Sequence, residues 1–194
     1  MSVGLIQGCC YGAKKELSEM IKFRDAIIED CDGIGLVIVS ASHSAFIGAI
    51  PEEFIDFTWT PEVSAANWRK SFEENTDRGQ LFLVAEENHR VLGFIWAKPW
   101  AETAGYEACV QGLYVLPSFH RRGIGRNLIG CAVKELMRRN LKSLEIGCVV
   151  ENPNCDFYRQ LGGVEIGRRT VRVDRYDTEE IIFGWQDMSI LQGS

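Results

Sequence analysis

One stretch of the sequence, from Val110 to Ile129, constrains the fold and the function of this chain more than any other. A run rich in β-forming residues ends at Pro117, a basic turn with two glycines follows, and an amphipathic helix begins directly after the turn. The first N–H groups of a helix have no partner within the helix and carry a partial positive charge, and glycines let an anion come close to them. The stretch therefore predicts a strand, turn and helix that hold a phosphate. For the glycine pair alone, a plain helix start with solvated arginines is the alternative.

The turn consists of six consecutive residues: Arg121, Arg122, Gly123, Ile124, Gly125 and Arg126. Its three arginines add charge-assisted contacts, because the planar guanidinium matches the oxygens of a phosphate. Two well-known phosphate-binding loops do not match the turn. A P-loop requires Gly-Lys followed by Ser or Thr, and a dinucleotide fingerprint requires a third glycine where this sequence has Leu128.

The same residues resemble the acyl-CoA signature of the GNAT superfamily of N-acetyltransferases. That signature is Gln or Arg, two residues, Gly, one residue, and then Gly or Ala. Here His120 stands in the first position, and Gly123 and Gly125 stand in the other two. Because His120 replaces Gln or Arg, we expect the pyrophosphate clamp to work through backbone donors and arginine side chains.

A second segment lies downstream, at residues 151–163, and its sequence marks both ends of a short helix. Asn152 is suited to cap the helix, Pro153 to occupy its first position, and Gly162 to end it. Taken alone, Phe157 and Tyr158 are expected to be core aromatic residues.

This segment resembles the Asn and Phe-Tyr-x-x-Leu-Gly element that follows the fifth strand in the GNAT family. The resemblance implies that Asn152 contacts the pantetheine arm and that the hydroxyl of Tyr158 lies near the CoA sulfur. Tyr158 is then the general acid for the departing thiolate, and Cys155 lies beside the cofactor, where packing is its expected role.

The order of elements predicts an α/β domain with a mixed, mainly antiparallel central sheet and helices on both faces. Strands are expected at 21–25, 81–86, 91–98, 107–116, 144–150, 164–173 and 180–187, and helices at about 30–45, 61–74, 124–139 and 152–162, with a further short helix opening at Pro51. This order resembles the GNAT fold from about residue 20 to 187. The resemblance implies that the fourth and fifth strands splay apart after a bulge, and that Leu113, Tyr114 and Val115 bind the cofactor and supply an oxyanion donor.

The activity implied by the resemblance is transfer of an acetyl group from acetyl-CoA to a primary amine by direct attack. For the base, the sequence offers Glu107 at the start of the fourth strand, with a solvated carboxylate as the alternative interpretation. We expect the acceptor to be held by residues 34–76, by the loop from Pro99 to Tyr106 and by the terminal hairpin. Residues 1–110 hold 17 acidic and 9 basic side chains, which suits a cationic amine, amino acid or peptide amine but also serves solubility.

Three functional classes are disfavoured or kept as alternatives. A nucleic-acid binder would show a broad basic face, whereas the net charge of this chain is -6. A non-catalytic acyl-CoA-binding sensor or regulatory module is the principal alternative to the enzyme, and a nucleotide-binding protein that uses the same turn for ATP or NAD is the third.

The remaining expectations concern organisation and location. Residues 1–19 are expected to be an extension of unknown role, 20–187 the acetyltransferase-like domain and 188–194 a tail. The 7 cysteines form no Cys-x-x-Cys or metal-ligand pattern, so we expect reduced thiols, no metal and a cytoplasmic protein. Residues 33–51 carry no Asp, Glu, Lys or Arg, but Ser40 to Ser44 are too polar for a lone membrane span, so no membrane is expected. A homodimer is a possible assembly.

Overall fold

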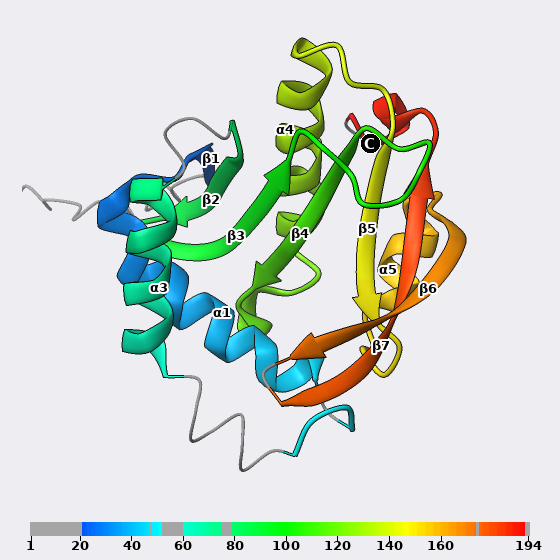
Figure 1. Cartoon of the computed structure of the whole chain (residues 1–194). Helices are drawn as coiled ribbons and strands as arrows, with labels where there is room; N and C mark the ends of the chain where they lie inside the picture. The colour runs from blue at the N-terminus through cyan, green and yellow to red at the C-terminus, as the bar shows by residue number, and fades with distance from the viewer. Residues whose placement is uncertain (1–20, 47, 52–59, 75–78, 174, 193–194) are drawn as a thin grey trace, which may run out of the picture.

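A single seven-stranded sheet runs through the computed structural model, which describes residues 21–46, 48–51, 60–74, 79–173 and 175–192 (Figure 1). Its strands lie in the order β1-β2-β3-β4-β5-β7-β6. They are β1 (Lys22–Asp25), β2 (Leu81–Glu87), β3 (Arg90–Lys98), β4 (Ala108–Val115), β5 (Leu144–Val149), β6 (Val164–Val173) and β7 (Tyr176–Trp185). Among these strands, β4 and β5 pair in parallel and all other neighbours are antiparallel. The expected mixed, mainly antiparallel sheet is confirmed.

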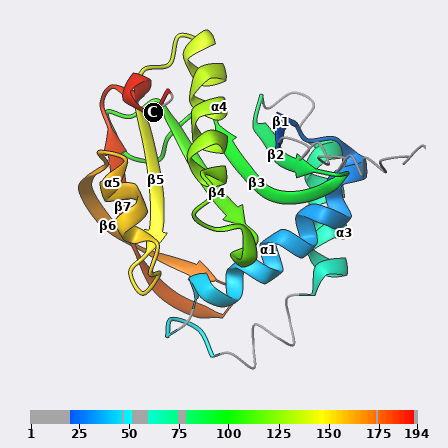
Figure 2. The same ribbon diagram turned by 180° about the vertical axis from the view of Figure 1, so that it is seen from behind.

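Helices cover both faces of this sheet, with α1 and α3 on one face and α4 and α5 on the other (Figures 1 and 2). Their bounds are α1 (Cys31–Ala45), α3 (Pro61–Glu74), α4 (Ile124–Arg138) and α5 (Cys155–Gln160), and short 3-10 turns lie at Ile28–Asp30, Pro117–Phe119 and Met188–Leu191. On the first face, Trp68 of α3 packs edge-on against Phe94. On the second, Ile124 and Leu128 of α4 lie against Gly93. Because strand side chains alternate between faces, each layer of helices buries its own half of the core.

The first helix shows how tertiary packing decides an ambiguous sequence. Its β-branched run and Gly35 favour a strand weakly, whereas the spacing of its apolar residues favours a helix. The chain forms the helix, and Ile34 and Val37 are fully buried along it. Asp30 precedes the helix as expected, but its carboxylate accepts hydrogen bonds from Arg24 at 2.7 and 2.8 Å and from the N–H of Ile27 at 2.8 Å, with no capping bond to the helix.

The C-terminal elements differ from the sequence expectation in their bounds. β7 begins at Tyr176, four residues before the expected start, because it pairs with β6 from Val173 onward in a tight hairpin. The charged residues of this hairpin hide the strand pattern in the sequence. Beyond residue 187 the chain forms the Met188–Leu191 turn, and both of its end residues are buried. The folded part therefore includes most of the expected tail, while the short helix expected near residue 52 and the extension 1–19 fall outside the described residues.

Within the parts of the chain that the structure describes, no helix combines the length and the hydropathy that crossing a membrane requires.

Candidate functional site

The two parallel strands at the centre of the sheet separate after three residue pairs. β4 and β5 are paired from Ala108 to Val110 on β4. The next residue, Gln111, is a bulge, because Val110 and Gly112 face consecutive residues of β3. A bulge bends its strand and increases the local twist, and the two strands diverge from this point in Figure 1. The expected splay of these two strands is confirmed, and beyond Val110 β5 no longer pairs with β4.

A cavity of about 670 Å³ opens at this gap. It is lined by the end of β4, the turn before α4, the end of β5, the start of α5, the end of α1 and one residue of β7. Of the site residues expected from the sequence, the cavity brings together Leu113, Tyr114, Val115, Arg121, Gly123, Ile124, Gly125, Arg126, Asn152 and Tyr158. Arg122, Cys155 and Glu107 are not part of its lining.

The turn before α4 has the backbone geometry of an anion cradle. Arg121 and Gly123 both have left-handed backbone conformations, with φ of 62° and 79°. The carbonyl of Gly123 accepts hydrogen bonds from the N–H and the side-chain amide of Asn127, at 3.0 and 2.9 Å. The first N–H groups of α4 belong to Ile124, Gly125 and Arg126, and helix geometry gives them no acceptor within the helix. Ile124, Gly125 and Arg126 line the cavity, so an anion in the cavity could reach their N–H groups.

The three arginines of the turn are not equivalent. Arg121 and Arg126 line the cavity, whereas Arg122 is turned away from it. Its guanidinium lies 3.1 Å from a carboxylate oxygen of Glu87 and stacks over the ring of Phe119 at 5.0 Å. The three arginines could not be distinguished from the sequence, because the difference depends on Glu87 of β2, which is distant in the chain and binds Arg122 alone.

His120, at the position where the family signature has Gln or Arg, supports the turn. Its Nε2 donates a hydrogen bond to the carbonyl of Val115 at 2.9 Å. The imidazole therefore ties the turn to the end of β4, and that nitrogen is engaged with the backbone. This arrangement fits a clamp that relies on backbone donors and on Arg121 and Arg126.

On the opposite wall, α5 carries Tyr158 into the cavity. The side chain is 8% exposed, and its ring packs against Phe157 and Phe183 at 5.3 and 5.6 Å. Burial raises the pKa of the Tyr158 hydroxyl well above its usual range, and the neighbouring groups Cys148, Tyr114, Cys155 and Glu180 raise it further. The hydroxyl therefore keeps its proton at neutral pH, as a general acid must.

The residues around the start of α5 depart from the expected pattern. The helix begins at Cys155, and Asn152 does not cap it. Its side-chain oxygen instead accepts from the N–H and the amide of Asn154, at 2.8 and 3.0 Å, and forms a turn before the helix. The thiol of Cys155 is buried 3.1 Å from that of Cys148 and does not line the cavity. At the other end of the helix, Gly162 follows the last turn with φ of 82°, as predicted.

The structure does not bring Glu107 to the cavity. Its carboxylate accepts from the backbone N–H groups of Lys142 and Ser143, at 2.6 and 3.4 Å, and so holds the connection between α4 and β5. Glu107 precedes β4, and six residues of strand at about 3.3 Å each separate it from Leu113 by about 20 Å. Glu107 was chosen as the base because it precedes β4. The gap between β4 and β5, however, opens at the C-terminal end of β4.

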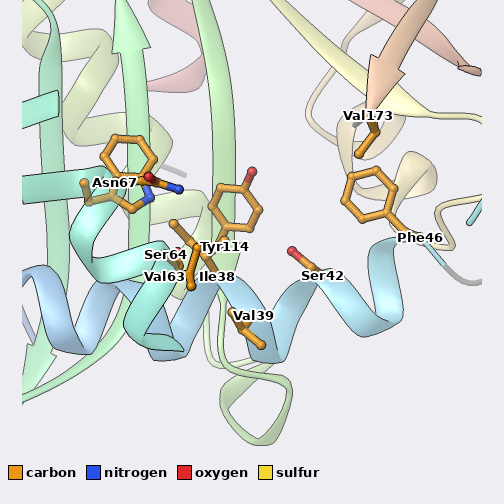
Figure 3. A pocket seen from close by; sticks show the side chains of 10 residues that line it. Ile38, Val39, Ser42, Phe46, Val63, Ser64, Asn67, Tyr114 and Val173 are labelled. Carbon is orange, nitrogen blue, oxygen red and sulfur yellow. The ribbon is translucent and has the colours of Figure 1, made fainter. Parts of the chain in front are cut away.

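A second cavity, of about 310 Å³, lies between α1, α3 and the end of β6 (Figure 3). Its lining consists of Ile38, Val39, Ser42, Phe46, Val63, Ser64, Asn67, Trp68, Tyr114 and Val173. Tyr114 and Phe46 also line the larger cavity, so the two cavities adjoin. No charged side chain lines the second cavity among the described residues. Residues 34–76 and the terminal hairpin contribute lining residues to this cavity, and the loop from Pro99 to Tyr106 contributes none.

One functional candidate was missed in the sequence. Glu180 of β7 lines the larger cavity, and its carboxylate accepts from Nε of Arg169 at 3.1 Å. The sequence placed Glu180 at the start of a strand, and nothing in it indicated that β7 lies next to β5 and so reaches the gap.

The model of the Acetyltransferase (GNAT) family matches residues 46–163. Among curated relatives, an uncharacterized N-acetyltransferase of Methanocaldococcus jannaschii is 27% identical over 113 residues, which cover 55% of this chain and 43% of the relative. A mycothiol acetyltransferase of Renibacterium salmoninarum is 27% identical over 106 residues, which cover 52% of this chain and 31% of the relative. The chain therefore aligns with less than half the length of these curated relatives.

Several solved structures share the fold. An N-acetyltransferase from Staphylococcus aureus Mu50 has a TM-score of 0.64 and 18% identity, covering 88% of this chain and 99% of that one. A putative acetyltransferase from Salmonella typhimurium, solved with its cofactor acetyl-CoA, has a TM-score of 0.63 and 22% identity, covering 86% and 94%. An N-acetyltransferase from Thermoplasma acidophilum, in complex with coenzyme A, has a TM-score of 0.60 and 23% identity, covering 85% and 98%. At these identities the likeness establishes a common fold.

Proposed function

This chain belongs to the GNAT acetyltransferase family, and we propose that it transfers an acetyl group from acetyl-CoA to a primary amine. The observation that carries the proposal is the larger cavity, in which an anion cradle, an unpaired strand edge and a buried tyrosine meet. Two structures of the same fold, from Salmonella typhimurium and Thermoplasma acidophilum, were solved with acetyl-CoA and coenzyme A, and they support this choice of cofactor.

The cavity has a wall for each part of acetyl-CoA. The pyrophosphate is proposed to lie on the first N–H groups of α4, with Arg121 and Arg126 beside it. The pantetheine arm is proposed to lie along residues 113–115 of β4, whose edge is free of β5, and to pass Asn152 on the opposite side. The thioester then ends near Tyr158.

The proposed reaction is direct attack of the amine nitrogen on the thioester carbonyl carbon. An N–H of the free β4 edge stabilises the oxyanion of the tetrahedral intermediate. As the C–S bond breaks, the electron pair goes to sulfur, and Tyr158 donates its proton to the thiolate. The place of Tyr158 in the lining of the cavity, across from the end of β4, supports this role.

The acceptor is proposed to enter through the second cavity. Its described lining is mostly apolar, with polar groups on Ser42, Ser64, Asn67, Trp68 and Tyr114, and carries no charge. Such a surface accommodates an apolar or hydrogen-bonding group next to the amine, and it offers no ion pair to a second cationic group. We therefore propose an acceptor with an uncharged group beside the reactive amine, in preference to an acceptor that carries a second cationic group.

An amine screen tests both the activity and the acceptor class. Release of free CoA thiol from acetyl-CoA is measured with two sets of amines. Phenethylamine, isobutylamine and leucinamide have uncharged tails, whereas spermidine and agmatine carry a further cationic group. The products are identified by mass spectrometry. The expected result is acetylation of the uncharged-tail amines with at least about tenfold higher kcat/KM, a difference of about 1.4 kcal/mol. A preference for the cationic acceptors would overturn the acceptor class. Saturable acetyl-CoA binding without acetylation of any amine would favour the non-catalytic binding module.

Arg121 and Arg126 line the cavity and Arg122 does not, so Arg122 serves as a matched control for the other two. Arg121→Ala and Arg126→Ala are each expected to weaken acetyl-CoA binding about tenfold, because each removes a charge-assisted contact worth about 1.4 kcal/mol. Arg122→Ala should change the affinity by less than about twofold, because Arg122 is held by Glu87 and Phe119. Isothermal titration at low and high salt checks this, since the loss should shrink as salt rises. An equal loss in Arg122→Ala would show that all three arginines contact the cofactor.

A further inference from the structure

We propose that Glu180 is the general base of the transfer reaction, receiving the proton of the acceptor amine, directly or through one water, on the face of the sheet opposite to α5. The inference rests on the proposed function, because it assigns a residue to the amine-transfer step. It replaces Glu107, whose carboxylate is bound to backbone N–H groups away from the cavity.

Two acidic side chains line the cavity among the described residues, and only one is placed for this role. Asp156 is 76% exposed and pairs with Arg159 at 2.7 Å on the outer surface of α5. Glu180 is 19% exposed and lies inside, on β7. A base must be within hydrogen-bond reach of the attacking amine, and Glu180 is the carboxylate that the described fold holds at the gap.

The position of Glu180 follows from the register of β7 with β5 and from the glycine at position 147. Glu180 lies opposite Val149 in the antiparallel pair of β7 with β5, so the two side chains share a face. A Cβ on Gly147 would overlap a carboxylate oxygen of Glu180. The carboxylate therefore lies across Gly147, where the absence of a side chain lets it rest against β5 beside the gap.

Tyr158 approaches the same gap from the other face. It packs on Phe183, which lies an odd number of residues from Glu180 on β7 and therefore points to the opposite side. Tyr114 lies opposite Phe94, which contacts Trp68 of α3, so Tyr114 is on the face that α1 and α3 cover. Tyr114 and Glu180 both line the larger cavity. Burial raises the pKa of the Tyr114 hydroxyl, and the charge of Glu180 raises it further.

This arrangement separates the two proton transfers by the thickness of the sheet. The acceptor amine enters from the second cavity, past Tyr114, and meets the thioester at the gap. The acceptor binds as an ammonium ion, and Glu180 takes one proton from its nitrogen on that side and releases it to solvent. After the attack, the Glu180 carboxylate takes the second nitrogen proton. Tyr158 gives one proton to the departing sulfur on the other side, so that the products are the amide, free CoA thiol, protonated Glu180 and the tyrosinate. Return of the proton from Glu180 to Tyr158 through solvent restores both groups.

Arg169 holds Glu180 in place without using all of its acceptor capacity. Nε of Arg169 donates to Oε2 of Glu180 at 3.1 Å, and its Nη1 donates to Glu102 at 2.8 Å. Oε1 of Glu180 accepts no hydrogen bond from the residues that the structure describes. The ionisable groups around Glu180 are Arg169 on β6, Cys148 on β5, Tyr114 on β4 and Tyr158 on α5.

The test compares Glu180→Gln with Glu179→Gln. Glutamine keeps the shape of Glu180 and can still accept from Arg169, but it cannot take a proton. Glu179 is the matched control, because it is the neighbouring residue on the same strand and pairs with Arg168 at 2.9 Å on the exposed surface. With phenethylamine as acceptor at pH 7, Glu180→Gln is expected to lower kcat by about 10²-fold or more, whereas Glu179→Gln stays within about threefold.

The pH profile separates a base from a merely structural residue. An alkyl amine with a pKa of roughly 10.4 is neutral in only about one molecule in 2,500 at pH 7, and this fraction rises about tenfold per pH unit. Glu180→Gln should therefore regain about tenfold in kcat per unit between pH 7 and 9, while the wild type changes much less. A pH-independent loss, or full activity in the variant, would overturn the role of Glu180.

Measuring acetyl-CoA binding distinguishes failure of the Glu180 inference from failure of the proposed function. Both variants are expected to bind acetyl-CoA within about twofold of the wild type by calorimetry, which also reports that they are folded. If the wild type acetylates phenethylamine and Glu180→Gln does so equally, the inference fails and the function stands. If the wild type binds acetyl-CoA and acetylates no amine of the screen, the proposed function itself fails.

Discussion

Replacing Tyr158 by Phe is expected to lower the turnover number by about 10²- to 10⁴-fold and to leave the affinity for acetyl-CoA within about twofold. The hydroxyl of Tyr158 lies in the cavity, on a ring held by Phe157 and Phe183. Phenylalanine preserves that packing and removes only the proton donor. The thiolate must then leave without an acid, while the cradle and the edge of β4 still bind the cofactor.

Single-turnover acetyl transfer and calorimetric titration of acetyl-CoA measure these two quantities separately. Tyr106→Phe is the matched control, because it makes the same change in a loop that lines neither cavity. Burial raises the pKa of Tyr158, so the hydroxyl stays protonated as pH rises, and the wild-type rate should not fall between pH 7 and 9 through loss of this acid. Unchanged turnover in Tyr158→Phe would show that the thiolate receives its proton from elsewhere.

Replacing Gly123 by Val is expected to abolish the stabilisation that acetyl-CoA gives to the protein. Gly123 has φ of 79°, a conformation in which a β-branched residue is strained by more than 1 kcal/mol. Relieving that strain moves the turn and misaligns the first N–H groups of α4, on which the cradle depends. Saturation at about 100 times Kd stabilises a protein by about 2.7 kcal/mol, so the wild type should gain several degrees in Tm and the variant almost none.

Gly125→Ala is the control for this prediction. A Cβ at residue 125 would lie 3.5 Å from Phe157 and 3.6 Å from Leu113, which is ordinary van der Waals contact, and the backbone there needs no glycine. The variant should keep most of the acetyl-CoA shift. If Gly123→Val keeps the full shift while remaining folded, the cofactor does not bind on this turn.

The parts of the site that the sequence predicted are those that depend on local structure. The turn at Arg121 to Arg126 is determined by its own glycines and by the helix that follows, so its place and its unpaired donors follow from a few adjacent residues. Tyr158 was selected through the resemblance of residues 151–163 to a short family element, and its role as the acid stays a prediction. In both cases the residues that define the motif are close together in the chain.

The parts that the sequence did not predict depend on contacts between distant elements. Arg122 turns away from the cavity because β2 supplies Glu87. Asn152 bonds to Asn154 in a turn instead of capping α5, so the helix starts at Cys155, two residues later than expected. Glu180 reaches the gap only because β7 lies beside β5, and that neighbourhood is set by sheet order, which periodicity along one strand does not reveal.

A crystal structure with coenzyme A bound would show where the cofactor lies on the turn before α4. The proposed binding mode places pyrophosphate oxygens at about 2.7 to 3.2 Å from the N–H groups of residues 124–126. It also places the pantetheine arm between β4 and β5 and the sulfur beside the hydroxyl of Tyr158. Coenzyme A bound away from the turn, or a sulfur that lies on the far side of α5 from Tyr158, would contradict it.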